Sequence, residues 1–339
     1  MQVLVTGGAG FIGSNLVGHL LKKGHQVTVV DNLITGQIEN VEQFSNTAGF
    51  EFINCGIESA EFPELFAKTM RPFERIYNLA CPTGVPNIEI LGDEILAACS
   101  TGTRNVLNLA AEMGAKFLLT SSSEIYGQPE VFPQAENYSG NVNPLSARAN
   151  YEEGKRFSET LVQRFVKTRG VEGKIVRLFN VYGPNMRLED SRVVSRFVTQ
   201  ALQGKPLTVH GDGSQRRTLC YVSEIVAGLE LVMEKGTAGK AYNLGSDQEI
   251  TIFDLAKLIV EITDSTSEIT FIERPDHDHN SRWPALKEIA ALGWERRIDL
   301  RDGLCLALEY FQTHLGSNKQ TETIETQACL LPYINPEKA

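Results

Sequence analysis

The sequence predicts an α/β fold of the doubly wound kind, in which helices cover both faces of a parallel sheet. The first half of the chain alternates short, unbroken runs of Val, Ile and Leu with longer helical patterns. Such runs are typical of strands that are buried on both faces. In addition, the first strand passes through a glycine-rich turn directly into a helix. Right-handed crossovers of this type wind the sheet in both directions.

The elements of the first half follow from this alternation. Apolar runs predict the strands, and the longer amphipathic stretches between them predict the helices. The expected strands cover residues 3–6, 26–30, 50–54, 75–79, 116–120 and 174–178. The expected helices cover residues 11–23, 90–113 and 151–169.

The alternation loosens after residue 180. Helices are expected at 193–203, 222–234, 253–262 and 300–314, with a strand at 268–273 and a glycine-rich turn at 210–214. We expect residues 1–178, with parts of 218–248, to form the sheet domain. Residues 179–217 and 249–315 are expected to form a smaller α+β lobe that interleaves with the sheet. Residues 316–339 form a polar tail, which is expected to be extended or disordered.

Composition excludes several classes of protein. The chain has 339 residues, 42% of them hydrophobic, and a formal net charge of −10. This argues against a disordered chain and against a nucleic-acid partner. Six scattered cysteines without a C-x-x-C pair argue against a disulfide scaffold or a zinc site. No run is long and apolar enough for a membrane span, and no signal peptide is recognised, so a cytoplasmic protein is expected.

The turn after the first strand predicts a dinucleotide site. Gly7, Gly10 and Gly13 are spaced three residues apart between a strand and a helix. Gly7 permits the tight turn, Gly10 lets the backbone approach a pyrophosphate, and Gly13 lets the helix pack close to the sheet. The N–H groups of the first helical turn, which includes Phe11 and Ile12, then face the phosphates. This predicts a Rossmann-type domain.

The end of the second strand indicates which dinucleotide binds. Asp31 stands eighteen residues after Gly13, and no Arg follows it in Asn32-Leu-Ile-Thr35. A carboxylate at this place hydrogen-bonds a ribose 2′-hydroxyl and repels a 2′-phosphate, so NAD is favoured over NADP. The alternative is an ordinary aspartate in a turn.

Tyr151 and Lys155 are candidates for acid–base chemistry. They stand four residues apart, so they share one face of the expected helix. A nearby ammonium favours the phenolate, and we expect it, together with the positive nicotinamide, to lower the phenol pKa. Tyr151 could then take a proton from a sugar hydroxyl. The same spacing also occurs in surface pairs of no function.

A second polar cluster follows the strand at 116–120. Ser122, Ser123 and Glu124 come at the carboxyl end of that strand, where ligands of open α/β sheets bind. Either serine could share a hydrogen bond with a reacting hydroxyl, and Glu124 supplies a carboxylate. The alternative is a serine-rich turn with Glu124 in solvent.

Together these motifs resemble the extended short-chain dehydrogenases/reductases, the epimerase/dehydratase family that acts on nucleotide sugars. The resemblance covers about residues 1–314. Its further marks are Asn-Leu-Ala at 78–80, Ser-Ser-Glu-Ile-Tyr-Gly at 122–127 and Arg-x-Phe-Asn-x-Tyr-Gly-Pro at 177–184. Within that family, residues 123–131, 148–156 and 192–195 are most similar to the UDP-glucuronate decarboxylases.

The resemblance implies a reaction. Tyr151 deprotonates the C4 hydroxyl of UDP-glucuronate while hydride passes from C4 to NAD⁺. The C4 ketone then permits loss of carbon dioxide, and Glu124 protonates C5 or orients the water that does. Return of hydride to C4 gives UDP-xylose, so the cofactor ends as it began.

The resemblance also implies binding residues. Those for NAD are Gly7, Gly10, Phe11, Ile12, Gly13, Asp31, Asn32, Leu79, Ala80, Tyr151 and Lys155. Those for the nucleotide sugar are Pro82, Asn180, Arg192, Val194, Arg217 and Arg282. Arg217 is expected to reach the pyrophosphate or sugar, and Arg282 to hold a phosphate with two hydrogen bonds. Asn180 is expected at a phosphate oxygen, and Arg192 and Val194 near the uracil. A homodimer is implied through helices within 90–113 and 151–169.

Two departures and three alternatives stay open. Many members carry Asp where this chain has Gly56, and Asn where it has Cys99, and both positions lie on the cofactor side. A 4,6-dehydratase usually has Asp at the position of Ser123, and a 4-epimerase usually lacks the carboxylate of Glu124. A non-catalytic binding protein would need none of Tyr151, Lys155 and Glu124. The run Asp-His-Asp-His at 276–279 is interpreted as an exposed loop and not as a metal site.

Overall fold

The computed structural model describes residues 1–67, 72–188, 190–274 and 281–325. Within them, a seven-stranded sheet has the order β10-β6-β5-β4-β1-β2-β3, and every neighbouring pair is parallel. Its strands are β1 (Gln2–Thr6), β2 (Gln26–Asp31), β3 (Phe50–Asn54), β4 (Arg75–Asn78), β5 (Lys116–Ser122), β6 (Gly173–Leu178) and β10 (Ala241–Leu244). The predicted doubly wound parallel sheet is confirmed.

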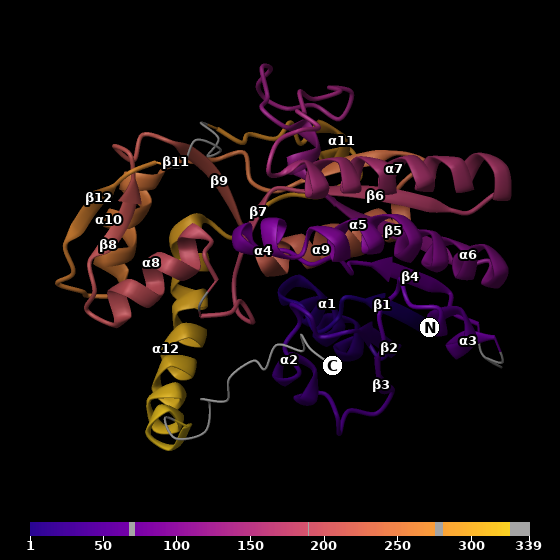
Figure 1. Cartoon of the computed structure of the whole chain (residues 1–339), viewed down its shortest axis with the longest axis horizontal. Helices are drawn as coiled ribbons and strands as arrows, with labels where there is room; N and C mark the ends of the chain where they lie inside the picture. Colours follow the sequence, from indigo (N-terminus) through magenta and orange to yellow (C-terminus); the bar gives the residue numbers. More distant parts are fainter. Residues whose placement is uncertain (68–71, 189, 275–280, 326–339) are drawn as a thin grey trace, which may run out of the picture.

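Helices cover both faces of this sheet, and each face has its own core. On one face, α1 (Phe11–Lys22) and α9 (Val222–Lys235) pack together over a cluster that includes Leu16, Val29 and Ile225. On the other face, α6 (Thr103–Met113) and α7 (Ala149–Arg169) lie side by side (Figure 1) over a cluster that includes Val106 and Val162. Apolar side chains of the central strands alternate between these two cores, which is why β1 carries the unbroken apolar run Val3–Val5.

The smaller lobe lies beside the carboxyl ends of the sheet strands, on the left in Figure 1. It contains α8 (Val193–Leu202), α10 (Ile252–Ile262) and the first part of α12 (Leu300–Glu325), which share a third core with Phe197 and Phe311. Two small sheets complete it. One pairs β12 (Ile269–Ile272) with β8 (Leu207–His210), and the other has the order β11 (Glu249–Thr251), β9 (Arg216–Tyr221) and β7 (Asn180–Tyr182).

Short elements connect these parts. They are α2 (Glu39–Glu42), α3 (Glu61–Phe66), α4 (Val85–Ile90), α5 (Gly92–Ala97), a 3₁₀ turn at Ser123–Tyr126 and α11 (Lys287–Ala290).

Two predicted elements differ from the structure. The helix expected at 90–113 is interrupted, because α5 and α6 are joined by a π-helical segment, Ala98–Gly102, and a separate helix, α4, precedes them with a proline in its first turn. Single π turns of this kind occur often at functional sites. The tail expected from residue 316 is also different, since α12 continues to Glu325. The last fourteen residues lie outside the described part of the chain, as does the Asp-His-Asp-His run.

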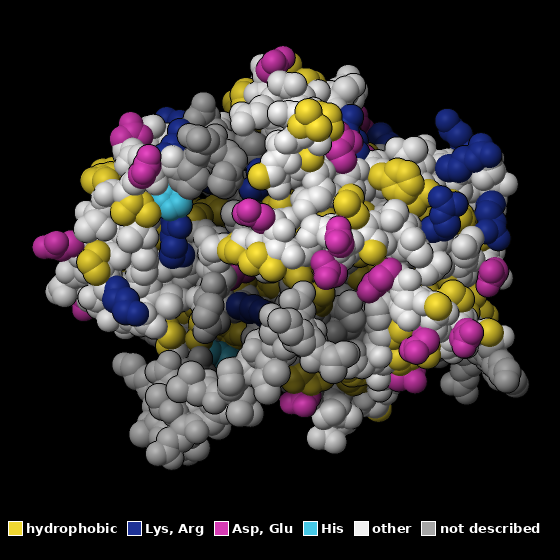
Figure 2. All heavy atoms as spheres, in the orientation of Figure 1, with side chains coloured by type: hydrophobic (Ala, Val, Ile, Leu, Met, Phe, Trp, Pro, Cys, Tyr) yellow, Lys and Arg dark blue, Asp and Glu magenta, His cyan; other side chains and the backbone are white. Residues whose placement is uncertain are grey.

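The surface is chemically mixed. On the face shown in Figure 2, Lys and Arg side chains gather at the C-terminal end of α7, and acidic and hydrophobic side chains are scattered over the rest. In the part of the chain that the structure describes, no helix is both long and apolar enough to cross a bilayer.

Candidate active site

A cavity of about 980 Å³ opens at the carboxyl ends of the central strands and extends to the smaller lobe. The strand order reverses between β1 and β4, and open α/β sheets bind their ligands at such a switch point. All the residues that the sequence suggested line this cavity. They are Gly7, Gly10, Phe11, Ile12, Gly13, Asp31, Asn32, Leu79, Ala80, Pro82, Ser122, Ser123, Glu124, Tyr151, Lys155, Asn180, Arg192, Val194, Arg217 and Arg282.

The glycine turn leaves the start of α1 open toward the cavity. Gly7 has φ +73°, and a Cβ there would lie 2.6 Å from the backbone nitrogen of Ala80. α1 begins at Phe11 without any side-chain cap for its first N–H groups. Uncapped N–H groups and the positive end of the helix suit a pyrophosphate. The residues present therefore fit a dinucleotide.

We expect Gly13→Ala to destabilise the chain and to abolish dinucleotide binding. A Cβ at Gly13 would lie 2.1 Å from the Gly7 carbonyl oxygen, so α1 must move away from the turn. Overpacking of this kind lowers the free energy of unfolding by about 1–3 kcal/mol. Denaturant unfolding and calorimetry with NAD⁺ measure the two effects.

Gly24→Ala is the matched control for that substitution. Gly24 has φ +77° and no atom within 4 Å of the position that a Cβ would take. An alanine there is therefore strained in its backbone but meets no steric clash. It should cost about 1–2 kcal/mol and leave NAD⁺ affinity unchanged. Equal NAD⁺ affinities in the two variants would contradict the role given to Gly13.

Asp31 is held at the end of β2 by two backbone groups. Its carboxylate oxygens accept hydrogen bonds from the N–H of Ala9 (3.0 Å) and of Leu33 (2.9 Å). Burial raises the pKa of Asp31, and those two hydrogen bonds oppose the rise. The side chain is thus fixed at the cavity wall, where its remaining lone pairs can accept from a ribose hydroxyl.

Beyond Asp31, a carboxylate takes up the space that Gly56 leaves. A Cβ at Gly56 would lie 2.3 Å from Oε1 of Glu58. The same oxygen accepts a hydrogen bond from the Asn32 amide at 3.3 Å, and all three residues line the cavity. The missing Asp of the family pattern is thus accompanied by a glutamate two residues later.

Tyr151 and Lys155 face the cavity from the first turns of α7. The Lys155 Nζ lies 5.8 Å from the Tyr151 ring centroid and donates to the Thr120 carbonyl at 3.1 Å. Burial raises the pKa of Tyr151 to about 12, although the Lys155 ammonium and Ser122 act to lower it. In the cofactor-free chain desolvation thus outweighs the ammonium, and the expected lowering of the phenol pKa by the ammonium and the nicotinamide together stays a prediction.

The neighbours of Lys155 raise its pKa. Burial alone would lower its pKa, but the anionic forms of Cys81, Tyr151 and Cys99 raise it above the usual value for lysine. The ammonium is therefore retained at neutral pH in a buried place. It can hold the Tyr151 oxygen as an anion during proton transfer.

Glu124 is held between two guanidinium groups. Arg148, which precedes α7, places Nη2 2.7 Å and Nε 3.3 Å from Oε2 of Glu124. Nη2 of Arg282 lies 3.2 Å from the same oxygen, and its Nη1 donates to the Ser123 carbonyl at 2.9 Å. Arg282 is only 2% exposed. The Ser122 hydroxyl accepts the Glu124 N–H, so it caps the 3₁₀ turn that carries the carboxylate.

Arg148 was missed as a functional residue in the sequence. It stands three residues before Tyr151, so the same helical-face argument that joined Tyr151 to Lys155 could have found it. Arg282, expected at a phosphate, lies beside the carboxylate of Glu124.

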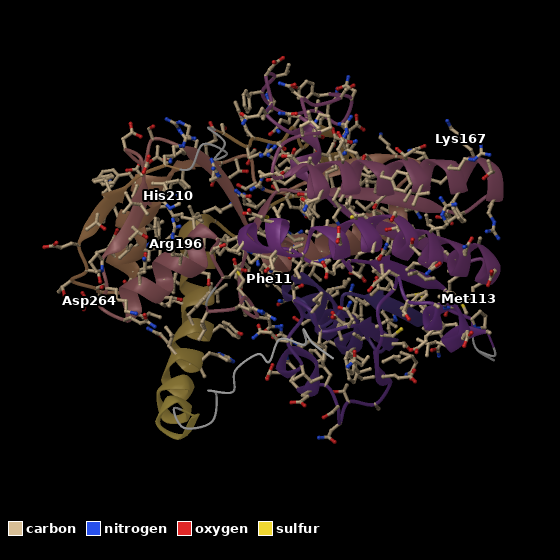
Figure 3. All side chains as sticks on the ribbon, in the orientation of Figure 1. Phe11, Met113, Lys167, Arg196, His210 and Asp264 are labelled. Carbon is tan, nitrogen blue, oxygen red and sulfur yellow. The ribbon has the colours of Figure 1, made fainter. Side chains whose placement is uncertain are left out.

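The remaining cavity wall comes from the smaller lobe. The Arg192 side chain pairs with Asp190, and its guanidinium lies 5.4 Å from the ring centroid of Phe11. Figure 3 shows Phe11 where the two lobes meet, with Arg196 and His210 on the smaller-lobe side. Arg196 and His210 contact each other at 3.3 Å and also line the cavity. The smaller lobe thus places arginine side chains at its end of the cavity, and an anionic ligand would need such cationic groups.

Two further observations concern metals and thiols. Among the described residues, no group of His, Cys, Asp and Glu could hold a metal ion. The sulfurs of Cys81 and Cys99 lie 3.7 Å apart beside Lys155, a contact that the scattered cysteines of the sequence did not suggest.

The chain is similar to known proteins over most of its length. The model of the NAD dependent epimerase/dehydratase family matches residues 3–245. UDP-glucuronic acid decarboxylase 1 of Xenopus tropicalis is 42% identical over 324 residues, which is 95% of this chain and 75% of that protein. Among solved structures, UDP-glucose 4-epimerase of Thermotoga maritima is 30% identical with a TM-score of 0.85, and the match covers 93% of this chain and all of that one. A UDP-glucuronic acid 4-epimerase variant of Bacillus cereus is 26% identical with a TM-score of 0.82, and the match covers 93% of this chain and all of that one. That variant was solved with UDP-4-deoxy-4-fluoro-glucuronic acid and NAD.

Proposed function

The chain belongs to the NAD dependent epimerase/dehydratase family, and on that premise we propose that it converts UDP-glucuronate into UDP-xylose and carbon dioxide. One observation of the structure carries the choice of reaction. The Glu124 carboxylate is held by Arg148 and Arg282 in the cavity that contains Tyr151 and Lys155. The likeness to decarboxylases of UDP-glucuronic acid over 95% of the chain supports the same reaction.

The cofactor is NAD. The glycine turn and the open start of α1 hold its pyrophosphate, and Asp31 accepts from its ribose. Bound NAD⁺ would supply the acceptor for a hydride from C4 of the sugar, and its reduced form the hydride that returns to the same carbon. We propose that Glu58 and Asn32 contact the adenine side, since they line that end of the cavity.

Tyr151 begins the reaction as a base. It takes the proton of the C4 hydroxyl, while Lys155 stabilises the phenolate that this requires. Ser122 lines the same cavity and acts to lower the pKa of Tyr151, and we propose that its hydroxyl shares the C4 hydroxyl of the substrate. When the reaction ends, the proton returns to the C4 oxygen by the same route.

The sugar carboxylate leaves from the ketone that results. The C4 carbonyl is β to the carboxylate on C5, so carbon dioxide departs and its bonding electron pair passes into an enolate. Two guanidinium groups favour the ionised form of Glu124. We therefore propose that Glu124 orients the water that protonates C5, and that Arg148 and Arg282 position this carboxylate.

Two other reactions of the family fit less well. Dehydration needs an acid for a departing hydroxyl at the position where this chain has Ser123, and that residue is 4% exposed with its carbonyl bonded to Arg282. Epimerisation needs the ketone to rotate in the site and has no use for a carboxylate clamped like Glu124.

The test is product analysis after incubation with UDP-glucuronate, with and without added NAD⁺. We expect a product lighter by one carbon dioxide, with the proton couplings of xylose. A product of unchanged mass with C4 inverted would mean an epimerase. Bound but unchanged UDP-glucuronate would favour the non-catalytic alternative.

We also propose a homodimer in a reducing, cytoplasmic setting. α5 and α7 pack together, and their outer faces carry Leu96 and Phe157, each 45% exposed, along a groove of about 870 Å³. Figure 2 shows hydrophobic side chains over α7 on this face. The matching helices of a second copy would cover them in a four-helix bundle. The five cysteines of the described residues are free thiols, as in a reducing compartment.

Phe157→Glu should make the protein monomeric. A charge in the centre of the α5–α7 face has no partner when a second copy covers it. Light scattering would report half the mass of the unmodified protein. Phe271→Glu is the control, because Phe271 is 56% exposed on β12 of the smaller lobe and should leave the mass unchanged. An unmodified protein that is already monomeric would overturn the dimer.

A further inference from the structure

We propose that Cys81 and Cys99 form a reversible disulfide that switches the active site off when hydrogen peroxide oxidises them. The effect on activity rests on the function proposed above, whereas formation of the bridge does not. The two sulfurs lie 3.7 Å apart, although the residues are 18 positions apart in the chain. Among the described cysteines, Cys81 and Cys99 are the pair whose sulfurs are in contact, and they lie beside the catalytic Lys155.

The pair joins the cavity to the helix that carries the catalytic residues. Cys81 follows β4, is half-buried and lines the active-site cavity. Cys99 is buried in the π-helical segment, and its sulfur lies against Gly154, between Tyr151 and Lys155 on α7. A Cβ at Gly154 would come within 3.3 Å of that sulfur. Any movement of Cys99 therefore displaces the turn of α7 that carries Tyr151 and Lys155.

The surroundings make this pair reactive. A hydrogen bond from the Cys81 thiol lowers the pKa of Cys99 to about 6, and Lys155 and Ser158 act in the same direction against desolvation. One thiolate is thus shared by the pair at neutral pH, beside a fixed ammonium. Thiolates of this kind are the species that peroxides oxidise. Cys81 faces the cavity, so peroxide reaches the pair there.

The chemistry balances with peroxide as the only oxidant. The Cys99 thiolate attacks one oxygen of a peroxide that has entered beside Cys81, the O–O bond breaks, and the departing hydroxide takes the proton of the Cys81 thiol and becomes water. The Cys81 sulfur then attacks the Cys99 sulfur of the sulfenic acid and expels hydroxide, which takes a proton and becomes the second water. Two thiols lose two electrons and two protons in all, and the peroxide is reduced to two waters.

The bridge should stop catalysis through position and charge. A disulfide has its sulfurs about 2.0 Å apart, so the pair must close by roughly 1.7 Å. Either Cys81 withdraws with its neighbours Pro82 and Thr83 from the cavity wall, or the π-helical segment moves against Gly154. Displacements of about 1 Å at a reacting centre can cost about a hundredfold in rate. Lys155 also loses the thiolate that it pairs with.

The bridge can be detected without any activity. Arg75 and Arg104 are the trypsin sites that flank the pair, and no Lys or Arg stands between them. Both cysteines therefore lie in one peptide, residues 76–104. After peroxide treatment and alkylation of free thiols, we expect this peptide to lack two hydrogens and to carry no alkyl group. Dithiothreitol should restore it. This measurement uses the unmodified full chain, so it needs no variant to fold.

Activity is followed in parallel in a Cys305→Ser background, which removes an exposed thiol. We expect oxidation to lower kcat/KM by about a hundredfold and dithiothreitol to restore it. Cys99→Ser and Cys81→Ser, each compared with its own reduced state, should lose this sensitivity. Cys55→Ser is the matched control, because Cys55 lines the same cavity but lies outside the pair, and it should keep both bridge and sensitivity.

Three results would overturn the switch. They are sulfinic acid at one cysteine without a bridge, a bridge that forms without loss of activity, and a Cys99→Ser variant that is as sensitive to peroxide as the protein with both cysteines. A fourth result would separate the switch from the proposed function. If the reduced protein releases no carbon dioxide but the peptide still bridges, the proposed reaction fails and the disulfide site stands.

Discussion

Tyr151→Phe should lower kcat for release of carbon dioxide by about 10²–10⁴-fold, the usual contribution of a general base. The substitution removes one oxygen and leaves the ring in place, so KM for UDP-glucuronate should change little. Tyr151 lines the cavity with the Lys155 ammonium 5.8 Å from its ring centroid, and Ser122 acts to lower its pKa. No other phenol lines the cavity among the described residues.

The pH dependence should carry the same signature. Burial raises the pKa of Tyr151 to about 12 in the cofactor-free chain, so the phenol is protonated at neutral pH. The base is the phenolate, and kcat should therefore rise with pH until the pKa of Tyr151 in the complex is passed. Bound NAD⁺ places a positive nicotinamide nearby and should move that pKa downward. Tyrosinate absorbance, taken as the difference between the unmodified protein and Tyr151→Phe, measures it.

Tyr242→Phe is the control for both measurements. Tyr242 is buried in β10, and its hydroxyl accepts from the Thr237 N–H at 3.0 Å, outside the cavity. Its loss should cost about 1 kcal/mol of stability and leave kcat unchanged. Unchanged kcat in Tyr151→Phe would remove Tyr151 from the mechanism.

The fold could be predicted because its signals are local. The apolar run that forms β1 predicts a buried strand by composition alone, and Gly7, Gly10 and Gly13 indicate the turn by their spacing. β7, β8, β9, β10 and β11 were not predicted, and each of them pairs with strands far away in the sequence. Their pairing depends on tertiary contacts, and no periodicity in the chain encodes those.

The predicted residues lie around one cavity because the ends of parallel strands share one edge of the sheet. The partners of those residues could not be predicted in the same way. Arg282 reaches Glu124 from 158 residues away along the chain, and Cys81 meets Cys99 only because the π-helical segment turns its sulfur toward β4. The desolvation that raises the pKa of Tyr151 could not be predicted either, because a sequence shows neighbours four residues apart but does not show burial.

Glu124→Gln should lower kcat by about 10²–10⁴-fold while UDP-glucuronate still binds. The amide keeps the size of the side chain but removes the charge that Arg148 and Arg282 hold. Without that charge the water beside C5 loses its acceptor, and two guanidinium groups face each other across a neutral amide. Arg282 is 2% exposed, so stability should also fall by about 1–3 kcal/mol. Circular dichroism at the assay temperature checks that the variant is folded.

The step that fails should identify what Glu124 does. Tyr151→Phe blocks the reaction before any ketone forms, whereas Glu124→Gln leaves Tyr151 intact and should let a 4-keto sugar accumulate, which hydroxylamine traps as an oxime. A trapped sugar without its carboxylate places Glu124 at protonation of C5, and one that retains the carboxylate places it at loss of carbon dioxide. Glu153→Gln is the control, since Glu153 lies on α7 two residues after Tyr151, pairs with Arg156 and is 44% exposed at its side chain. If Glu124→Gln, like the control Glu153→Gln, turned over at the rate of the unmodified protein, the Glu124 carboxylate would have no part in the reaction. That carboxylate is the feature that separates this chain from an epimerase.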